Sequence, residues 1–125
     1  MSNATKNKRR FIRFNFPYTI NIYPSRKKMI STYTENISEG GVNVVIKEKI
    51  NPASIVRLQI YLKNAPLILK GKVVWVKEKE NTLLEDEAVI YFNTGIEFQQ
   101  LKKEEKKIIK NCVKRTKHAK AQSPH

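Results

Sequence analysis

Apolar and polar residues alternate with a period of two in several short segments between residues 17 and 100. Such alternation is typical of strands that bury one face and expose the other. It predicts six strands, at about 18–23, 28–35, 42–46, 56–62, 67–79 and 88–98. Turn residues separate these segments and no helical period lies between them, which favours an all-β fold, an antiparallel barrel, over a parallel sheet.

Two of the predicted strands contain a glycine in their interior. Gly71 lies within the long fifth segment and Gly95 within the sixth, and each predicts a bulge or a bend of the kind that barrel closure needs. Trp75 has the same parity as Leu69 and Val73, so the alternation predicts that its side chain belongs to the core.

The period changes to that of a helix after Phe98. One helical face is apolar and lysines surround the rest, and the apolar residues are Leu101, Ile108, Ile109, Cys112 and Val113. This pattern predicts an amphipathic helix of about four turns, ending near 115–121, whose apolar stripe packs against the barrel. The prediction assigns Cys112 to packing rather than to chemistry.

A chain of 125 residues with one cysteine is expected to form one domain without an internal disulfide, as is usual in a reducing compartment. The first residues lack the apolar core of a signal peptide, and no apolar run is long enough to span a bilayer. These features predict a soluble, cytoplasmic protein with no transmembrane segment.

The formal net charge of +14 is concentrated at the two ends of the chain. Residues 1–30 carry eight Lys or Arg and no acid, residues 31–100 carry eight against nine acids, and residues 101–125 carry nine against two. A nucleic-acid surface normally spreads its cations over a folded face, so this distribution argues against specific nucleic-acid binding. An anionic ligand, an acidic protein or an anionic membrane are the partners that basic ends can serve.

Catalysis would need a nucleophile with a base, paired carboxylates or a cluster of metal ligands. None of these is spelled out in the sequence, and the two histidines lie in the basic C-terminal tail. The pattern therefore indicates a binding module with no metal and no catalytic residues, rather than an enzyme.

A polar corner between two predicted strands is the strongest candidate for binding. Asn36 and Ser38 stand two residues apart and precede the pair Gly40-Gly41, a combination that permits a sharp bend and a close approach of a ligand. Near the N-terminus, Arg9 and Arg13 offer guanidinium groups that suit phosphates and the O6/N7 edge of guanine. Taken singly, the corner also fits an ordinary turn and the arginines a solvated basic segment.

Together, Arg-x-x-x-Arg at 9–13 and Asn-x-Ser-x-x-Gly at 36–41 resemble the PilZ domain family, bacterial receptors for cyclic di-GMP. The segments 71–76 and 94–98 resemble later strands of that family. The resemblance implies a six-stranded barrel with a C-terminal helix, no cofactor, and a protein effector of the motility, adhesion or exopolysaccharide machinery. It also implies that cyclic di-GMP is bound by Arg9, Arg10, Arg13, Asn36, Ser38 and Gly41.

The domain organisation that follows has three parts. A flexible basic arm at 1–16 carries the arginine motif, a barrel spans 17–100, and a helix with a basic tail spans 101–125. Ligand binding is expected to order the arm and so to change the surface presented to a partner. The alternatives are a PilZ-like interaction module that needs no ligand and a basic barrel that binds nucleic acid.

Overall fold

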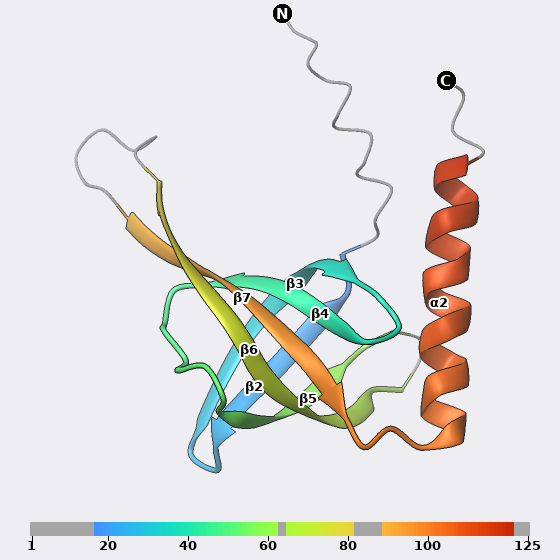
Figure 1. Ribbon diagram of the computed structural model, residues 1–125, viewed down its shortest axis with the longest axis horizontal. Helices are drawn as coiled ribbons and strands as arrows, with labels where there is room; N and C mark the ends of the chain where they lie inside the picture. The colour runs from blue at the N-terminus through green and yellow to red at the C-terminus, as the bar shows by residue number, and fades with distance from the viewer. Residues whose placement is uncertain (1–16, 63–64, 82–88, 122–125) are drawn as a thin grey trace, which may run out of the picture.

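The computed structural model describes residues 17–62, 65–81 and 89–121. Its elements are β2 (Thr19–Ser25), β3 (Lys28–Ile37), β4 (Gly41–Ile46), β5 (Ile55–Ile60), β6 (Leu67–Asn81), β7 (Val89–Gln99) and α2 (Lys103–Ala121). The strands close into an antiparallel barrel in the order β2-β3-β4-β7-β6-β5 (Figure 1). The predicted barrel of six strands followed by a helix is confirmed.

The alternating residues form the core as the pattern predicts. On β5, Val56, Leu58 and Ile60 point inward and are buried, whereas Arg57 between them is exposed. Because successive side chains of a strand point to opposite faces, every strand of a closed barrel contributes one row to the interior. The interior is mostly apolar, with Thr34 and Thr94 as buried polar residues, and the outer wall is where a site for a polar ligand can form.

Strand β6 departs from this alternation at a bulge. Its pairing with β7 shifts between Val73 and Trp75, so Val74 is an extra residue without a partner. Val73 is fully buried, but Val74 and Trp75 are 45% and 42% exposed. The prediction that Trp75 belongs to the core is therefore wrong, because the extra residue reverses which face the following side chains occupy.

Of the two glycines predicted to bend the strands, Gly95 lies opposite the bulge of β6 and Gly71 does not. Pairing is regular at Gly71, where an added Cβ would clash with the side chains of Ile96 and Leu58. Gly95 pairs with Trp75, and a Cβ there would lie within 3.0 Å of indole atoms of that residue. Both glycines make room for a neighbouring side chain, and the bulge itself is at Val74 of β6.

A second bulge lies near the end of β3. Its pairing with β4 shifts between Thr34 and Asn36, which leaves Glu35 as the extra residue. Thr34 faces inward and is buried, Asn36 is exposed, and Ile37 packs against the core. The bulge therefore turns Asn36 to the outer wall, although regular alternation from Thr34 would have pointed it inward.

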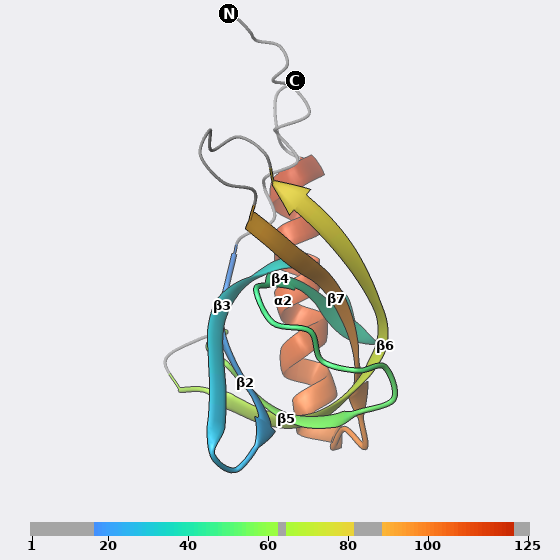
Figure 2. The same ribbon diagram turned by 90° about the vertical axis from the view of Figure 1, so that its left-hand side faces the viewer.

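Helix α2 lies beside the barrel in Figure 1, and in Figure 2 it is seen behind the ring of strands. It therefore lies across one open end of the barrel. Ile109 and Cys112 are 0% and 1% exposed and belong to the core, which confirms the predicted packing of the apolar stripe. The Cys112 thiol also donates a hydrogen bond to the Tyr18 hydroxyl at 2.8 Å. Within the part of the chain that the structure describes, no helix is long and apolar enough to cross a membrane.

Candidate functional site

A cross-strand row of side chains occupies the outer wall of β3, β4, β7 and β6. Asn36 pairs with Asn43, Asn43 pairs with Gly95, and Gly95 pairs with Trp75. A pocket of about 260 Å³ lies over this row, and its lining includes Asn36, Ser38, Gly41, Asn43, Trp75 and Glu97. The fold thus gathers the three residues of the predicted polar corner and adds an aromatic ring and a second amide.

The two bulges create this pocket. If Glu35 were paired regularly with β4, Asn36 would face the core, and if Val74 were paired regularly with β7, Trp75 would face the core. Bulges commonly re-aim side chains next to functional sites. Here the bulge at Glu35 places Asn36 at one end of the row, and the bulge at Val74 places Trp75 at the other end.

Trp75 offers a flat aromatic surface. Its indole lies over Gly95, the one residue type that leaves room for a ring so close to the backbone, and it remains 42% exposed. Nucleic-acid bases stack readily on such a surface because every base has a π face. The indole can therefore take a planar heterocycle at this end of the pocket.

The two asparagines offer hydrogen-bonding groups that the protein leaves free. Among the hydrogen bonds of the described residues, none involves the amide of Asn36. The Oδ1 atom of Asn43 is buried and also has no partner there. An unsatisfied buried acceptor costs about 1–3 kcal/mol, and a turn of the Asn43 amide toward a ligand donor in the pocket would remove that cost.

Ser38 holds the polar corner in shape. Its hydroxyl oxygen accepts from the backbone N–H groups of Gly40 and Gly41 at 3.3 and 3.2 Å. Its backbone N–H donates to the carbonyl of Gly41 at 2.9 Å. The side chain is exposed at the pocket, so its first role is to fix the loop and its predicted contact with a ligand would be additional.

Gly41 is required by the packing of β4 against β7. An added Cβ would collide with the carbonyl oxygen of Ile96, whereas a Cβ on Gly40 would meet nothing within 4 Å. Neither glycine has a positive φ. The sequence predicted that a ligand approaches the backbone closely at Gly41. In the structure, the backbone of β7 approaches Gly41 closely.

Among the described residues, the lining of this pocket contains no lysine or arginine, and its ionisable residue is Glu97. The predicted cations Arg9, Arg10 and Arg13 lie outside the described residues. Two hydrogen bonds fix Tyr18, where the chain enters the barrel. The Tyr18 N–H donates to Thr34 Oγ1 at 3.0 Å, and the Thr34 N–H donates to the Tyr18 carbonyl at 2.9 Å. The preceding residues therefore join the barrel beside Thr34, two positions before Asn36.

The sequence pattern did not indicate Trp75, Asn43 and Gly95 as parts of the candidate site. One signal for Trp75 was present, since residues 73–76 are four consecutive apolar residues in which alternation is lost. Such a run in a strand otherwise buried on one face is compatible with a bulge. Nothing local distinguished Asn43 from any other outward-facing polar residue.

The structure defines a small closed β-barrel with an aromatic and amide-lined pocket on its outer wall. A profile of the PilZ domain matches residues 7–115, and the chain belongs to the PilZ domain family. The family predicted from the two sequence motifs is thus confirmed. No curated protein matches the chain.

Solved structures with the same fold include the PilZ domain of Escherichia coli YcgR with c-di-GMP, at 13% identity and a TM-score of 0.61, covering 86% of this chain and 89% of that one. K. pneumoniae MrkH matches at 11% identity and a TM-score of 0.74, covering 88% of this chain and 48% of MrkH. The Bacillus subtilis inhibitor of motility MotI/DgrA matches at 18% identity and a TM-score of 0.63, covering 83% and 49%. The chain therefore spans about half the length of the last two proteins.

Proposed function

We propose that this chain is a receptor for cyclic di-GMP and has no catalytic activity of its own. The observation that carries the proposal is the outward row of two amides and one indole beside the Ser38 corner. Membership of the PilZ family supports it, as does the YcgR domain whose structure was solved with c-di-GMP. The choice of ligand also rests on the chemical groups that line the pocket.

Guanine matches the described part of the pocket. Its ring system can stack on Trp75, and its N1–H and N2 amino groups can donate to Oδ1 of Asn43 once that buried amide turns toward the pocket. Asn36 offers both a donor and an acceptor to the other polar edge. Ser38 would contribute by holding the corner and, through its exposed oxygen, by a contact of its own.

The two phosphates require cations that the described pocket lacks. We assign them to Arg9 and Arg13, with Arg10 and Lys8 adding charge beside them. Arg13 precedes Pro17 by four residues, so its Cα lies within roughly 14 Å of the Pro17 Cα. Since residue 18 is tied to Thr34, that reach covers the neighbourhood of Asn36.

Titration with cyclic di-GMP tests the proposal directly. Trp75 is the sole tryptophan of the chain, so stacking should change its fluorescence, and calorimetry should give one or two ligands per chain. Removing the ring in Trp75→Ala is expected to weaken binding about 10- to 100-fold, since stacking contributes about 1–3 kcal/mol per base. Gly95→Ala, which keeps the indole but displaces it, should weaken binding in the same direction.

Tyr61→Ala is a matched control, because Tyr61 is an exposed aromatic residue outside this pocket. Its affinity for the nucleotide should equal that of the wild type. Absence of heat with about 100 µM ligand would rule out the receptor, since weaker affinity could scarcely support signalling. Normal binding by Trp75→Ala would place the base elsewhere.

Binding is expected to order the basic arm at 1–16. An arm rich in like charges is drawn onto the barrel when an anion neutralises it, because its arginines gain charge-assisted hydrogen bonds. Amide hydrogen exchange in residues 6–16 should therefore slow when cyclic di-GMP is added, while exchange within β5 stays constant. Unchanged exchange in the arm at saturating ligand would exclude this mechanism.

The output is proposed to be a changed surface that a protein effector recognises. Tyr18 is suited to pass on the change, because it adjoins the arm, bonds Thr34 on β3 and accepts a hydrogen bond from Cys112 of α2. The lysine-rich face of α2 is one candidate surface for an acidic partner. MrkH is described as a c-di-GMP-dependent transcription regulatory factor, so DNA binding is the alternative output, although the charge distribution favours a protein.

A further inference from the structure

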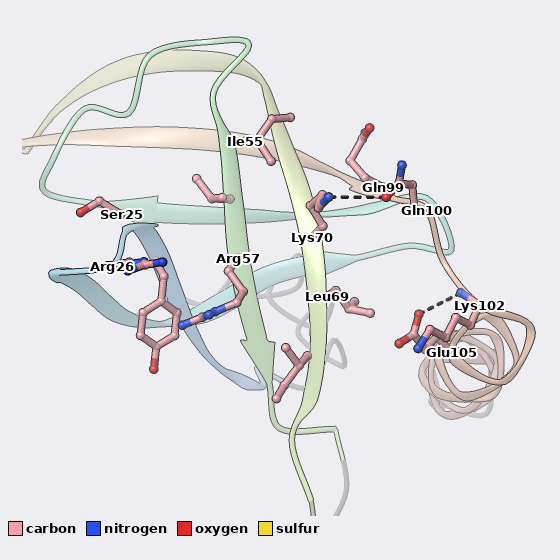
Figure 3. A pocket seen from close by; sticks show the side chains of 13 residues that line it. Ser25, Arg26, Ile55, Arg57, Leu69, Lys70, Gln99, Gln100, Lys102 and Glu105 are labelled. Carbon is pink, nitrogen blue, oxygen red and sulfur yellow. Dashed lines mark hydrogen bonds between the residues drawn. The ribbon is translucent and has the colours of Figure 1, made fainter.

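A second recess lies on a different part of the barrel wall, around β2, β5 and β6. It has a volume of about 470 Å³ and is bounded on one side by the β2–β3 turn and on the other by the start of α2 (Figure 3). Ligand sites typically measure about 300–1,000 Å³. We call it the β5–β6 recess, and it shares no lining residue with the pocket at Trp75.

Four cations from separate segments surround the β5–β6 recess. They are Arg26 in the β2–β3 turn, Arg57 on β5, Lys70 on β6 and Lys102 before α2 (Figure 3). Among the described residues the ion pair is Lys28 with Glu48, so none of the four is neutralised by a carboxylate. Glu105 is the acid in the lining, and its Oε1 accepts the Lys102 backbone N–H at 2.8 Å, as in the first turn of a capped helix.

Two of the cations are held toward the recess by neighbours. The Arg57 guanidinium lies over the ring of Tyr23, with 4.8 Å between its central carbon and the ring centroid. The Lys70 ammonium donates to Gln100 Oε1 at 3.5 Å. A cation over an aromatic ring loses less freedom on binding an anion, since part of its orientation is already set.

Exposed apolar side chains lie among these charges. Ile55 and Ile68 are 52% and 57% exposed on the outer faces of β5 and β6. The outer wall of a soluble barrel normally carries polar residues there, because these positions face water. Ile55 pairs with Lys72 and Ile68 with Gln59, so the cross-strand pair of Arg57 and Lys70 lies between the two isoleucines. A surface that combines exposed apolar side chains with cations is suited to bind a protein.

The composition of the recess decides among possible occupants. A second copy of the chain would bring another +14 charges against a basic rim, which disfavours self-association. A bilayer surface is flat and cannot fill a hollow between a turn and a helix. A nucleic-acid backbone has no apolar group to cover two isoleucines, whereas an acidic polypeptide segment can supply both carboxylates and an apolar side chain.

We propose that the β5–β6 recess binds an acidic segment of a partner protein, which places carboxylates on the cations around Arg57 and Lys70 and covers Ile55 and Ile68, on either side of that pair, with apolar side chains. This site would give the proposed receptor a surface for a partner protein. Only the role of the site in signalling rests on the proposed receptor function. Binding of the segment itself needs no nucleotide, so the two proposals succeed or fail separately.

The test uses the full chain and fluorescein-labelled peptides of alternating Asp and Glu, in which one or two leucines are moved through every position. Fluorescence polarisation at about 150 mM salt should detect binding of some of these peptides, because screening at that ionic strength suppresses long-range attraction. The same peptides with serine in place of leucine should bind at least fivefold more weakly. Peptides with lysine in place of the acids should not bind.

Variants locate the site. Arg57→Glu with Lys70→Glu is expected to lower affinity for the best peptide at least tenfold, and Ile68→Ser about fivefold. All three residues are exposed, so folding should survive, and melting curves check this. Lys107→Glu with Lys110→Glu makes the same charge change on exposed residues of α2 and should alter affinity less than threefold.

Several results would overturn the proposal. They are no binding by any peptide at about 1 mM, equal binding by the serine peptides, or an equal loss in the α2 variant, which would transfer the partner to the helix. Binding to phosphatidylglycerol vesicles that the recess variant abolishes, without peptide binding, would make the surface a membrane site. If the double variant failed to fold, peptide-induced amide shifts in the wild type would decide, with shifts at β5 and β6 supporting the recess and shifts elsewhere refuting it.

Discussion

Replacing Arg9 and Arg13 together with alanine is expected to weaken cyclic di-GMP binding at least a hundredfold and to leave the barrel folded. The described pocket contains no cation, so these two guanidinium groups are assigned both phosphates. A hydrogen bond to a charged group contributes about 1.5–3 kcal/mol. Two such losses correspond to roughly a 10²- to 10⁴-fold change, at 1.4 kcal/mol per tenfold.

Calorimetry of the double variant should be compared with Arg26→Ala combined with Lys27→Ala, which removes the same charge from the exposed β2–β3 turn. That control should lose less than threefold in nucleotide affinity, because its residues lie away from the pocket at Trp75. A loss of equal size in both variants would mean that net charge, and not the arginine motif, attracts the ligand. A loss below threefold in the Arg9 and Arg13 variant would assign the phosphates to other residues.

Gly41→Ala is expected to destabilise the fold by about 3 kcal/mol, at the upper end of the usual cost of overpacking. Its new methyl group would collide with the carbonyl oxygen of Ile96, a backbone atom that cannot move without separating β4 from β7. The melting temperature should fall by about 10 °C for a domain of this size. Nucleotide affinity should fall as well, because the paired strands carry Asn43 and Gly95.

Gly40→Ala provides the comparison within the same loop. An added Cβ there meets nothing within 4 Å, and the residue has no positive φ, so its melting temperature should stay within about 2 °C of the wild type. Equal destabilisation by the two substitutions would show that loop flexibility, rather than the contact with Ile96, explains the glycine pair. A stable Gly41→Ala variant that fails to bind would instead support close approach of the ligand at this position.

Much of the fold follows from local pattern. Alternation located every strand of the barrel to within a few residues, because a strand with one buried face must repeat every two residues. The change to a helical period located α2 and placed Cys112 in packing. The polar corner was also found, since Asn, Ser and Gly at that spacing have few roles outside turns and binding loops.

The aromatic half of the pocket was not predicted, for a physical reason. Whether Trp75 points inward depends on one extra residue at Val74, and the position of that bulge is set by the pairing of β6 with β7, which the alternation within β6 does not reveal. Gly71 was a misleading signal, because the space that glycine leaves there is filled by side chains of the core. Gly95 likewise leaves space for the indole of Trp75, and this relation becomes visible only when β6 and β7 are paired.

The two bulges also affect how the chain should be aligned with its relatives. Glu35 and Val74 are the extra residues at the two register shifts, and the residues on either side of each already pair with consecutive positions of the next strand. A relative that lacks either residue would therefore keep Asn36 and Trp75 on the same outward row. Single-residue gaps at these two points are neutral for the geometry of the site, and the spacing between sequence motifs can vary by one or two without a change in which side chains meet.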